Sequence, residues 1–275
     1  MDKPQPSTTP FTSSEYPFFP FTSVTTYLQN GQLRYNALQL EAMRRMGAIV
    51  FDAHWTWSNT MYNYGDTTNP YSPTQWGRDP YARRQYIPLS MSWALPFGKG
   101  LAHLSNASKP VDALLGGWNL QSIATFASGT YFSPSFTGTN PANTNTSGGL
   151  PDCLRNGNLP NGTRTWNQWF DPTAFAIPQP GHYGTCGINT LVGPGIYVWH
   201  ASISKDFHIT ERFKATLTMQ VSNLLNHPSL GSGTPPTPNT SINQANPGQF
   251  TSEEPYYNPE RQGARQVGLK LRLAW

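Results

Sequence analysis

The sequence predicts an all-β fold: an antiparallel, up-and-down transmembrane β-barrel segment with about seven or eight long strands. Three observations support this prediction. Apolar and polar residues alternate in several stretches, these stretches are long, and the connections between them alternate between short and long. The composition agrees, because a chain with 26 Pro, 24 Gly and 13% aromatic residues is poor in helix formers and rich in turn and strand formers.

The clearest alternating stretch is FKATLTMQVSN, residues 213–223. Successive side chains of a strand point to opposite faces, so its apolar residues share one face. The same period of two covers 35–46, 48–58, 85–98, 117–129, 196–207 and 265–275. Residues 33–275 are therefore predicted to form the barrel, and 1–32 an extended or loop segment. An eighth strand is expected over 21–29 if that segment pairs through Asn30-Gly31.

Strand length favours a membrane over a soluble sandwich. The stretches run about 10 to 14 residues, against roughly 5 to 6 for an average soluble strand, and a tilted strand needs about 9 to 11 to cross a bilayer. Their polar faces carry small uncharged groups, and charged residues are only 12% of the chain. Because backbone groups in lipid must all be hydrogen-bonded, the strands are expected to close into a barrel.

The connections set the expected topology. The first two strands follow each other almost directly, HITER (208–212) joins another pair, and 96–116 is intermediate. The long connections are 59–83, 130–192 and 224–262, which are rich in Asn, Thr, Gly and Pro and are expected to lack regular structure. Short turns on one side and long loops on the other are typical of outer-membrane barrels. With the long loops outside, the last strand runs inward and ends at the periplasmic rim.

The charge, the cysteines and the apolar segments of the chain limit which classes of protein it can belong to. The net charge is +4, but the basic residues are scattered, so nucleic-acid binding is not expected. The sequence contains no run of 18 apolar residues, so no transmembrane helix is predicted. The N-terminal residues do not resemble a signal peptide. Cys153 and Cys186 lie in Gly/Pro/Asn-rich stretches, which favours a disulfide in an oxidising compartment, with two free thiols as the alternative.

Several stretches, in order, resemble the C-terminal part of the barrel of TonB-dependent receptors, in particular Oar-like receptors with a carboxypeptidase-regulatory-like domain. They are YNALQLEAMRR (35–45), ALPFGKG (94–100), ALLGGWNLQSIATFASGTYFSP (113–134), FDPTAFAIP (170–178) and NTLVGPGIYVWHASISKDFHITERFKATLTMQVSNLLNHP (189–228). The spacing agrees over nearly the whole chain from about residue 33.

The resemblance implies a cell outer-membrane receptor that takes up, or exports, a ligand when it is part of a full 22-stranded receptor. Its implied partners are outer-membrane lipid, the barrel assembly machinery, an unknown extracellular ligand and the energy-coupling TonB protein, which acts through a plug domain. No plug or energy-coupling box is found, and 76–90 is shorter than in the family. The chain is therefore expected to be the terminal part of such a receptor.

Tryptophans near predicted strand ends are expected to form the aromatic girdle, because indole prefers the membrane interface. They are Trp55, Trp57, Trp93, Trp118, Trp199 and Trp275. The last strand ends on a terminal aromatic after alternating apolar residues, which resembles the C-terminal signal read by the assembly machinery. That signal comprises Val267, Leu269, Leu271, Leu273 and Trp275.

Ligand contact is expected from the loops 130–192 and 224–262, since binding residues often lie on loops held by a rigid scaffold. Aromatic residues there could stack on a ligand or pack the loops together. They are Tyr131, Phe132, Trp166, Trp169, Tyr256 and Tyr257. Asp52 and His54 share a polar face and could bind metal, but are expected to be lumen-facing hydrogen-bonding groups. No catalytic residue, metal site or cofactor is assigned, and no enzymatic activity is expected.

Two other interpretations of the sequence remain open. A secreted β-sandwich that binds or cleaves carbohydrate would also show aromatic loops. A non-functional truncated remnant would show the same strands with no activity of its own.

Overall fold

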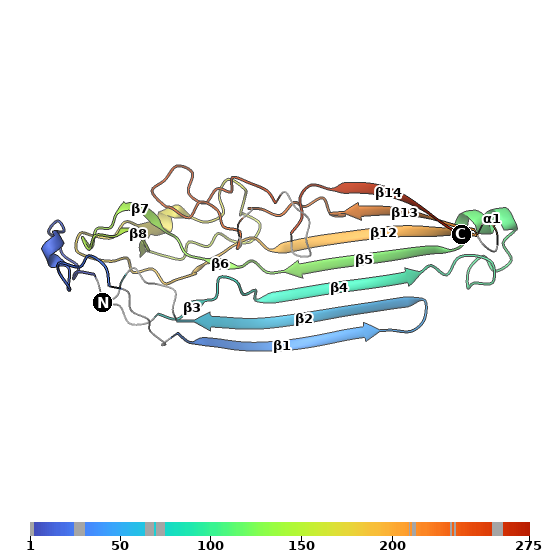
Figure 1. Ribbon diagram of the computed structural model, residues 1–275, viewed down its shortest axis with the longest axis horizontal. Helices are drawn as coiled ribbons and strands as arrows, with labels where there is room; N and C mark the ends of the chain where they lie inside the picture. The colour runs from blue at the N-terminus through green and yellow to red at the C-terminus, as the bar shows by residue number, and fades with distance from the viewer. Residues whose placement is uncertain are drawn as a thin grey trace.

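The computed structural model describes residues 3–24, 31–63, 69, 75–208, 210, 213–231, 233, 235–254 and 261–275. One large antiparallel sheet dominates it, as Figure 1 shows. Its long strands are β1 (Leu33–Arg44), β2 (Ile49–Tyr62), β4 (Gln85–Ala94), β5 (Trp118–Ala127), β12 (Ile196–His208), β13 (Lys214–Ser222) and β14 (Gln266–Ala274). They are ordered β1-β2-β4-β5-β12-β13-β14, so each long strand lies beside the next long strand along the chain.

The predicted strands are all present, with shifted ends. β2 continues past the predicted residue 58 to Tyr62, where it also pairs with the two-residue strand β3 (Gly77–Arg78). The expected strand 85–98 stops at Ala94. The eighth strand of the sheet is β3, whereas residues 25–29 of the expected strand 21–29 lie outside the described residues. Within the described part of the chain the sheet is open, with β1 and β14 at its edges.

The sheet has one apolar and one polar face, and the register proves that all strands share them. Directly opposed residues of antiparallel strands point to the same side. Leu273 lies opposite Ala215, and the chain of pairs continues through Phe207 and across the sheet to β1. We call the side containing Leu38, Phe51, Leu89, Leu120, Ile203, Leu217 and Leu271 the apolar face. The other side, the polar face, carries nearly all the Ser, Thr and Gln residues of the long strands, together with charged residues such as Asp52, Asp206 and Lys270.

No second sheet covers the apolar face in the described residues, since the remaining sheets are two-stranded. Its large side chains are accordingly exposed: Leu269 is 75% exposed and Leu271 64%. A soluble sandwich would bury this face against a facing sheet. The secreted β-sandwich interpretation is therefore wrong.

At one end of the sheet, the long connections fold into a compact unit that we call the cap, residues 128–195, 223–231, 235–254 and 261–265. It contains β6 (Tyr131–Phe132), β7 (Phe136–Thr139), β8 (Ser147–Gly149), β9 (Asp152–Cys153), η2 (Pro172–Ala174), β10 (Phe175–Ala176) and β11 (Leu191–Val192). Its buried core comprises Phe132, Phe170, Ala174, Phe175, Cys186 and Leu191. The expectation that 130–192 lacks regular structure is wrong, because this apolar cluster folds it.

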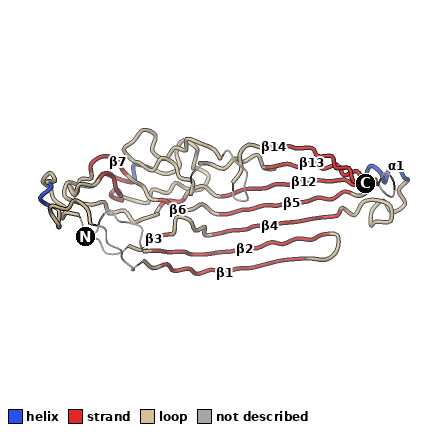
Figure 2. Tube along the Cα trace, viewed as in Figure 1, coloured by secondary structure: helices blue, strands red, loops and turns tan. Residues whose placement is uncertain are grey.

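The N-terminal segment, which includes η1 (Ser13–Glu15), lies against the cap. The Ser7 amide donates to the carbonyl of Ala142, and the Asn143 side chain donates to the carbonyl of Ser7. The opposite end of the sheet, the turn end, has the short connections. Its longest one carries α1 (Lys109–Leu115) and lies at the right of Figure 2, beside the C-terminus. None of the helices in the described ranges is long and apolar enough to cross a membrane.

Candidate functional site

The turn end of the apolar face is edged by indoles. Trp93 is the penultimate residue of β4, Trp118 is the first residue of β5, and Trp275 directly follows β14. The Trp118 indole donates to the carbonyl of Leu114 at 3.0 Å, so its polar atom is satisfied by the linker. Trp275 is 88% exposed. An exposed indole at the end of an apolar face suits the boundary between lipid and water.

Trp55 and Trp57 do not lie near a strand end, contrary to the prediction, because β2 is 14 residues long and extends beyond them. Trp57 nevertheless marks the limit of the apolar face. It lies opposite Leu38 on β1, and Gln85, the first residue of β4, lies opposite it on the other side. One step further toward the cap, the same face pairs Asn36 with Asn59. Trp57 thus lies where the apolar surface ends, whereas Trp55 lies two positions inside it.

Trp199 lies on the apolar face four residues into β12, toward the cap. Its indole Nε1 donates to Ser122 Oγ at 2.8 Å, and its ring packs edge-on against Phe126 at 6.4 Å. Tyr197 lies opposite Phe126, one same-face position nearer the cap. The hydrogen bond to Ser122 matters because an unpaired indole N–H would be costly in an apolar environment.

Lys205 is a charged residue on the apolar face that sequence reasoning missed. It lies opposite Leu217 and Trp118, yet only 3% of its surface is exposed. Its Nζ donates to the carbonyl of Gly116 and lies 5.5 Å from the Trp118 ring centroid. A long Lys stem can cover apolar surface while its ammonium reaches a polar partner near the interface. The sequence did indicate this location, because Lys205 is an even number of residues from Trp199 and Ile203 in IYVWHASISKDF and so shares their face of the strand.

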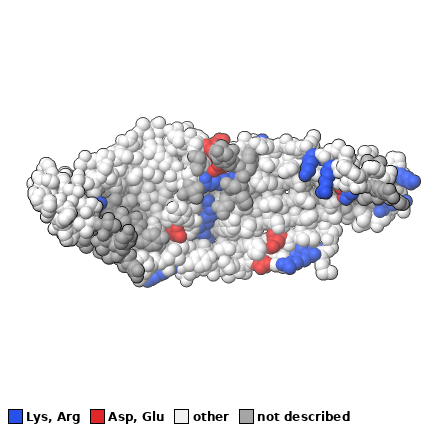
Figure 3. Space-filling view, in the orientation of Figure 1, with Lys and Arg blue, Asp and Glu red and all other residues white. Residues whose placement is uncertain are grey.

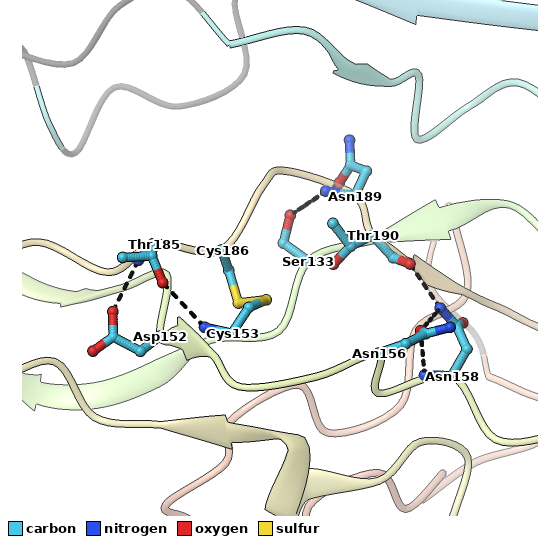
Figure 4. The surroundings of a disulfide bond; sticks show 9 residues. All are labelled: Ser133, Asp152, Cys153, Asn156, Asn158, Thr185, Cys186, Asn189 and Thr190. Carbon is cyan, nitrogen blue, oxygen red and sulfur yellow. Dashed lines mark hydrogen bonds between the residues drawn. A yellow bond between two sulfur atoms is a disulfide. The ribbon is translucent and has the colours of Figure 1, made fainter.

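The cap is tied together by a disulfide between Cys153 and Cys186, separated by 33 positions (Figure 4). Side chains around it lock the same two segments. The Thr185 amide donates to Asp152 Oδ1 at 3.0 Å, and the Cys153 amide donates to Thr185 Oγ1 at 3.2 Å. The cap is therefore a covalently closed and hydrogen-bonded body.

An Asx cap at η2 stabilises the same region. The hydroxyl of Thr173 donates to Asp171 Oδ1 at 2.7 Å, and Arg155 forms an ion pair with Asp171 Oδ2 at 2.8 Å. The Thr173 hydrogen bond, supported by Arg155, lowers the pKa of the Asp171 carboxyl below its ordinary value.

Most of the loop aromatics expected to contact ligand instead contribute to packing. Phe132 is buried in the cap core against Phe170, with centroids 6.1 Å apart, so ligand contact by Phe132 is wrong. Trp169 packs edge-on against Phe250 and donates to the carbonyl of Val192. Trp166 is half-buried, and its carbonyl accepts a hydrogen bond from the Phe250 amide. Tyr256 and Tyr257 lie outside the described residues.

Tyr131 differs because it lines a pocket between the end of β2 and the cap. This outer pocket has a volume of about 520 Å³, and Trp76, Arg78, Arg84 and Tyr131 are among its lining residues. The Arg78 guanidinium lies 5.1 Å from the Tyr131 ring centroid and donates to Asn59 Oδ1. Asn189 fixes one wall, since its amide donates to Tyr62 Oη and to the carbonyl of Arg78.

Cations concentrate around this pocket. The Arg34 guanidinium lies 4.3 Å above Trp76, and Arg84 lies 5.9 Å from Trp57. Figure 3 shows basic groups where the strands meet the cap, on an otherwise largely uncharged surface. Guanidinium and aromatic groups together can hold an anion that also presents a flat or apolar face.

The two-faced sheet has a counterpart among known protein families. Residues 1–267 match the outer membrane beta barrel domain. The chain belongs to this family. No curated protein and no solved structure gives a match.

Membership in the outer membrane beta barrel family accounts for the two-faced sheet. The location is the outer membrane, and the exposed apolar face is the surface that meets lipid. The alternating residues Val267, Leu269, Leu271 and Leu273 of β14 all lie on this face, with Trp275 beyond them. The polar face is the side turned away from lipid.

The polar face brings together residues that are separate in the sequence. His54 Nε2 lies 2.8 Å from Asp52 Oδ1, as the spacing of two allows. The register adds Glu41, which lies directly opposite His54 on β1. Sequence reasoning missed Glu41. The short turn between β1 and β2 could have indicated this pair, because the length of the turn fixes which residues of the two strands lie opposite each other. A second ion pair, Lys214–Asp206 at 2.8 Å, lies near the turn end.

Proposed function

We propose that this chain forms part of the transport barrel of an outer-membrane receptor of the TonB-dependent kind, with the cap outside the cell and the turn end in the periplasm. The observation that carries the proposal is the combination of a two-faced sheet with a folded, disulfide-tied cap at one end only. A barrel needs the sheet alone, whereas a rigid folded cap gives a receptor a surface on which to capture a ligand.

The outer pocket supports capture of an anionic ligand with a flat or sugar-like face. Arg78 and Arg84 supply charge-assisted hydrogen bonds, Trp76 supplies an aromatic surface, and the buried Tyr131 ring lies against the Arg78 guanidinium. Neither Glu nor Asp is among the residues lining this pocket. The ligand would then pass along the polar face, energised by a TonB partner acting through a plug, and the barrel assembly machinery would insert the chain.

Membrane residence is the first test. The chain, produced in a Gram-negative host with an added export signal, is expected to fractionate with outer membranes after an alkaline wash and to require detergent for extraction. The physical reason is the large apolar face, which water solvates poorly. Recovery of the folded chain as a monodisperse protein without detergent would contradict the proposal.

Ligand capture is tested with the purified chain in detergent micelles, by tryptophan fluorescence, using a hexamer of uronic acid as an anionic probe. A glucose hexamer is the neutral control. Arg78→Gln is expected to weaken binding about tenfold or more, since it removes a charge-assisted contact worth roughly 1.5–3 kcal/mol. Arg155→Gln is the matched control, because Arg155 is a cap arginine paired with Asp171 outside the pocket. Equal binding of both hexamers would refute anion recognition.

Energy coupling needs a separate test. In a full receptor that contains this barrel, deletion of the TonB partner is expected to abolish probe uptake while leaving probe binding to cells unchanged. Uptake that persists without the partner would show a passive channel instead.

A further inference from the structure

The polar face of β1 and β2 holds three side chains of the kinds that ligate metal ions. Within the described part of the chain, Glu41, Asp52 and His54 form such a group, and their nearest ligand atoms all lie within 4.8 Å of one another. The fold fixes this arrangement. Glu41 is the direct antiparallel partner of His54, and Asp52 precedes His54 by two positions on the same face. The three side chains therefore project from two hydrogen-bonded strands.

The close neighbour of Asp52 Oδ1 is the imidazole of His54. Asp52 Oδ1 lies 2.8 Å from His54 Nε2, is shielded from solvent, and has no partner with hydrogen-bond geometry. Two ligand atoms bound to one metal at about 2.1 Å lie about 3 Å apart in octahedral geometry. The spacing of these two atoms thus suits neighbouring positions in a coordination sphere.

We propose that Glu41, Asp52 and His54 form a binding site for a divalent first-row transition-metal ion such as Zn²⁺ or Mn²⁺. One imidazole nitrogen and two carboxylate oxygens match the preferences of these ions, whereas Mg²⁺ and Ca²⁺ favour oxygen ligands alone. Two carboxylates also offset the charge of the ion. Water would complete the coordination sphere, because the side chains of His54 and Asp52 are 45% and 47% exposed.

The surroundings on the polar face admit such an ion. Asp52 lines a pocket of about 360 Å³ together with Ser90, its direct partner on β4, and with Ser92 and Gln121. These uncharged groups can hydrogen-bond to metal-bound water or to the ligating carboxylate. Arg45 lines the same pocket and opposes cation binding. Figure 3 shows acidic groups beside basic ones over the turn-end half of β1 and β2.

A plain ion pair is the competing explanation. If His54 is protonated, it simply neutralises Asp52, and Glu41 is a nearby surface carboxylate. The two explanations differ in saturable metal binding, which only a coordination site shows. They also differ in their dependence on Glu41, which an ion pair between Asp52 and His54 does not need.

The test uses the full chain in detergent micelles, titrated with ZnCl₂ by calorimetry and with CoCl₂ by visible absorption. Wild type is expected to bind one ion, with proton release and a cobalt spectrum that includes a nitrogen ligand. His54→Gln and Glu41→Gln are each expected to weaken Zn²⁺ binding at least tenfold. Asp206→Asn is the matched control, because it removes the carboxylate of the other ion pair on the same face.

Three results would overturn the site: no saturable Zn²⁺ binding by wild type, wild-type affinity in both His54→Gln and Glu41→Gln, or an equal loss in Asp206→Asn. Circular dichroism of each variant verifies that the sheet has formed. If one of the variants His54→Gln and Glu41→Gln does not fold, the other is sufficient for the test. The measurement needs no transported ligand and no TonB partner, so its failure leaves the proposed receptor function standing.

Discussion

Arginine placed at adjacent positions of β13 should separate the two faces of the sheet quantitatively. Met219 lies on the apolar face, between Leu269 of β14 and Ile203 of β12. Gln220, the next residue, lies on the polar face opposite Gly268. The two residues are neighbours on one strand and both are exposed, so they differ mainly in which face of the sheet they occupy.

Met219→Arg puts a guanidinium into lipid, which costs about 2–4 kcal/mol near the bilayer midplane. That lowers the folding equilibrium constant about 30- to 700-fold, since each 1.4 kcal/mol is tenfold. Gln220→Arg should change stability by only about 0.5 kcal/mol, as for an ordinary exposed site. Gly268 leaves open space opposite the new side chain, and Lys270 on the diagonal adds a small like-charge repulsion.

The assay is reversible unfolding by guanidinium chloride in liposomes, followed by tryptophan fluorescence, with the free energy of unfolding extrapolated to zero denaturant. The expected difference between the two variants is about 1.5 kcal/mol or more. An equal cost at both positions, or a larger cost at Gln220, would refute the assignment of the apolar face to lipid.

Three further predictions concern the ends and the cap. Deletion of Trp275 in a full receptor should lower outer-membrane levels several-fold through poor assembly, measured by quantitative immunoblot of outer membranes, and unchanged levels would refute its role as a signal. Cys153→Ser combined with Cys186→Ser should destabilise the cap by about 3–4 kcal/mol, because a loop of about 33 residues is no longer closed, and proteolysis should then cut the cap while the sheet stays protected. The pKa of Asp171 is lowered chiefly by the hydrogen bond from Thr173, so its carboxylate stabilises the cap at pH values above the unfolded pKa, and this contribution is lost as the pH falls through the folded pKa. In Asp171→Asn, the stability of the cap, measured by hydrogen exchange, should therefore fall less steeply with decreasing pH than in wild type. An unchanged pH dependence would contradict the assignment.

Part of the candidate site could be predicted from sequence and part could not. The pairing of Cys153 with Cys186 needed only their number and their context in loop-like stretches. By contrast, Phe132 and Tyr131 are adjacent in sequence but have different fates, since one enters the cap core and the other lines the outer pocket. Local sequence cannot distinguish them, because burial depends on which distant segment packs against each ring.

The strands, their two faces and the apolar end of β14 follow from local sequence, because the period-two pattern arises from the alternation of side chains along one strand. The register and the packing of the cap depend on how distant segments meet. Register placed Glu41 opposite His54 and placed Lys205 among apolar residues, where its ammonium reaches the Gly116 carbonyl. It also showed that Trp57, although in the middle of β2, lies where the apolar face ends. These are properties of pairs of segments, and their energies depend on contacts that no single stretch contains.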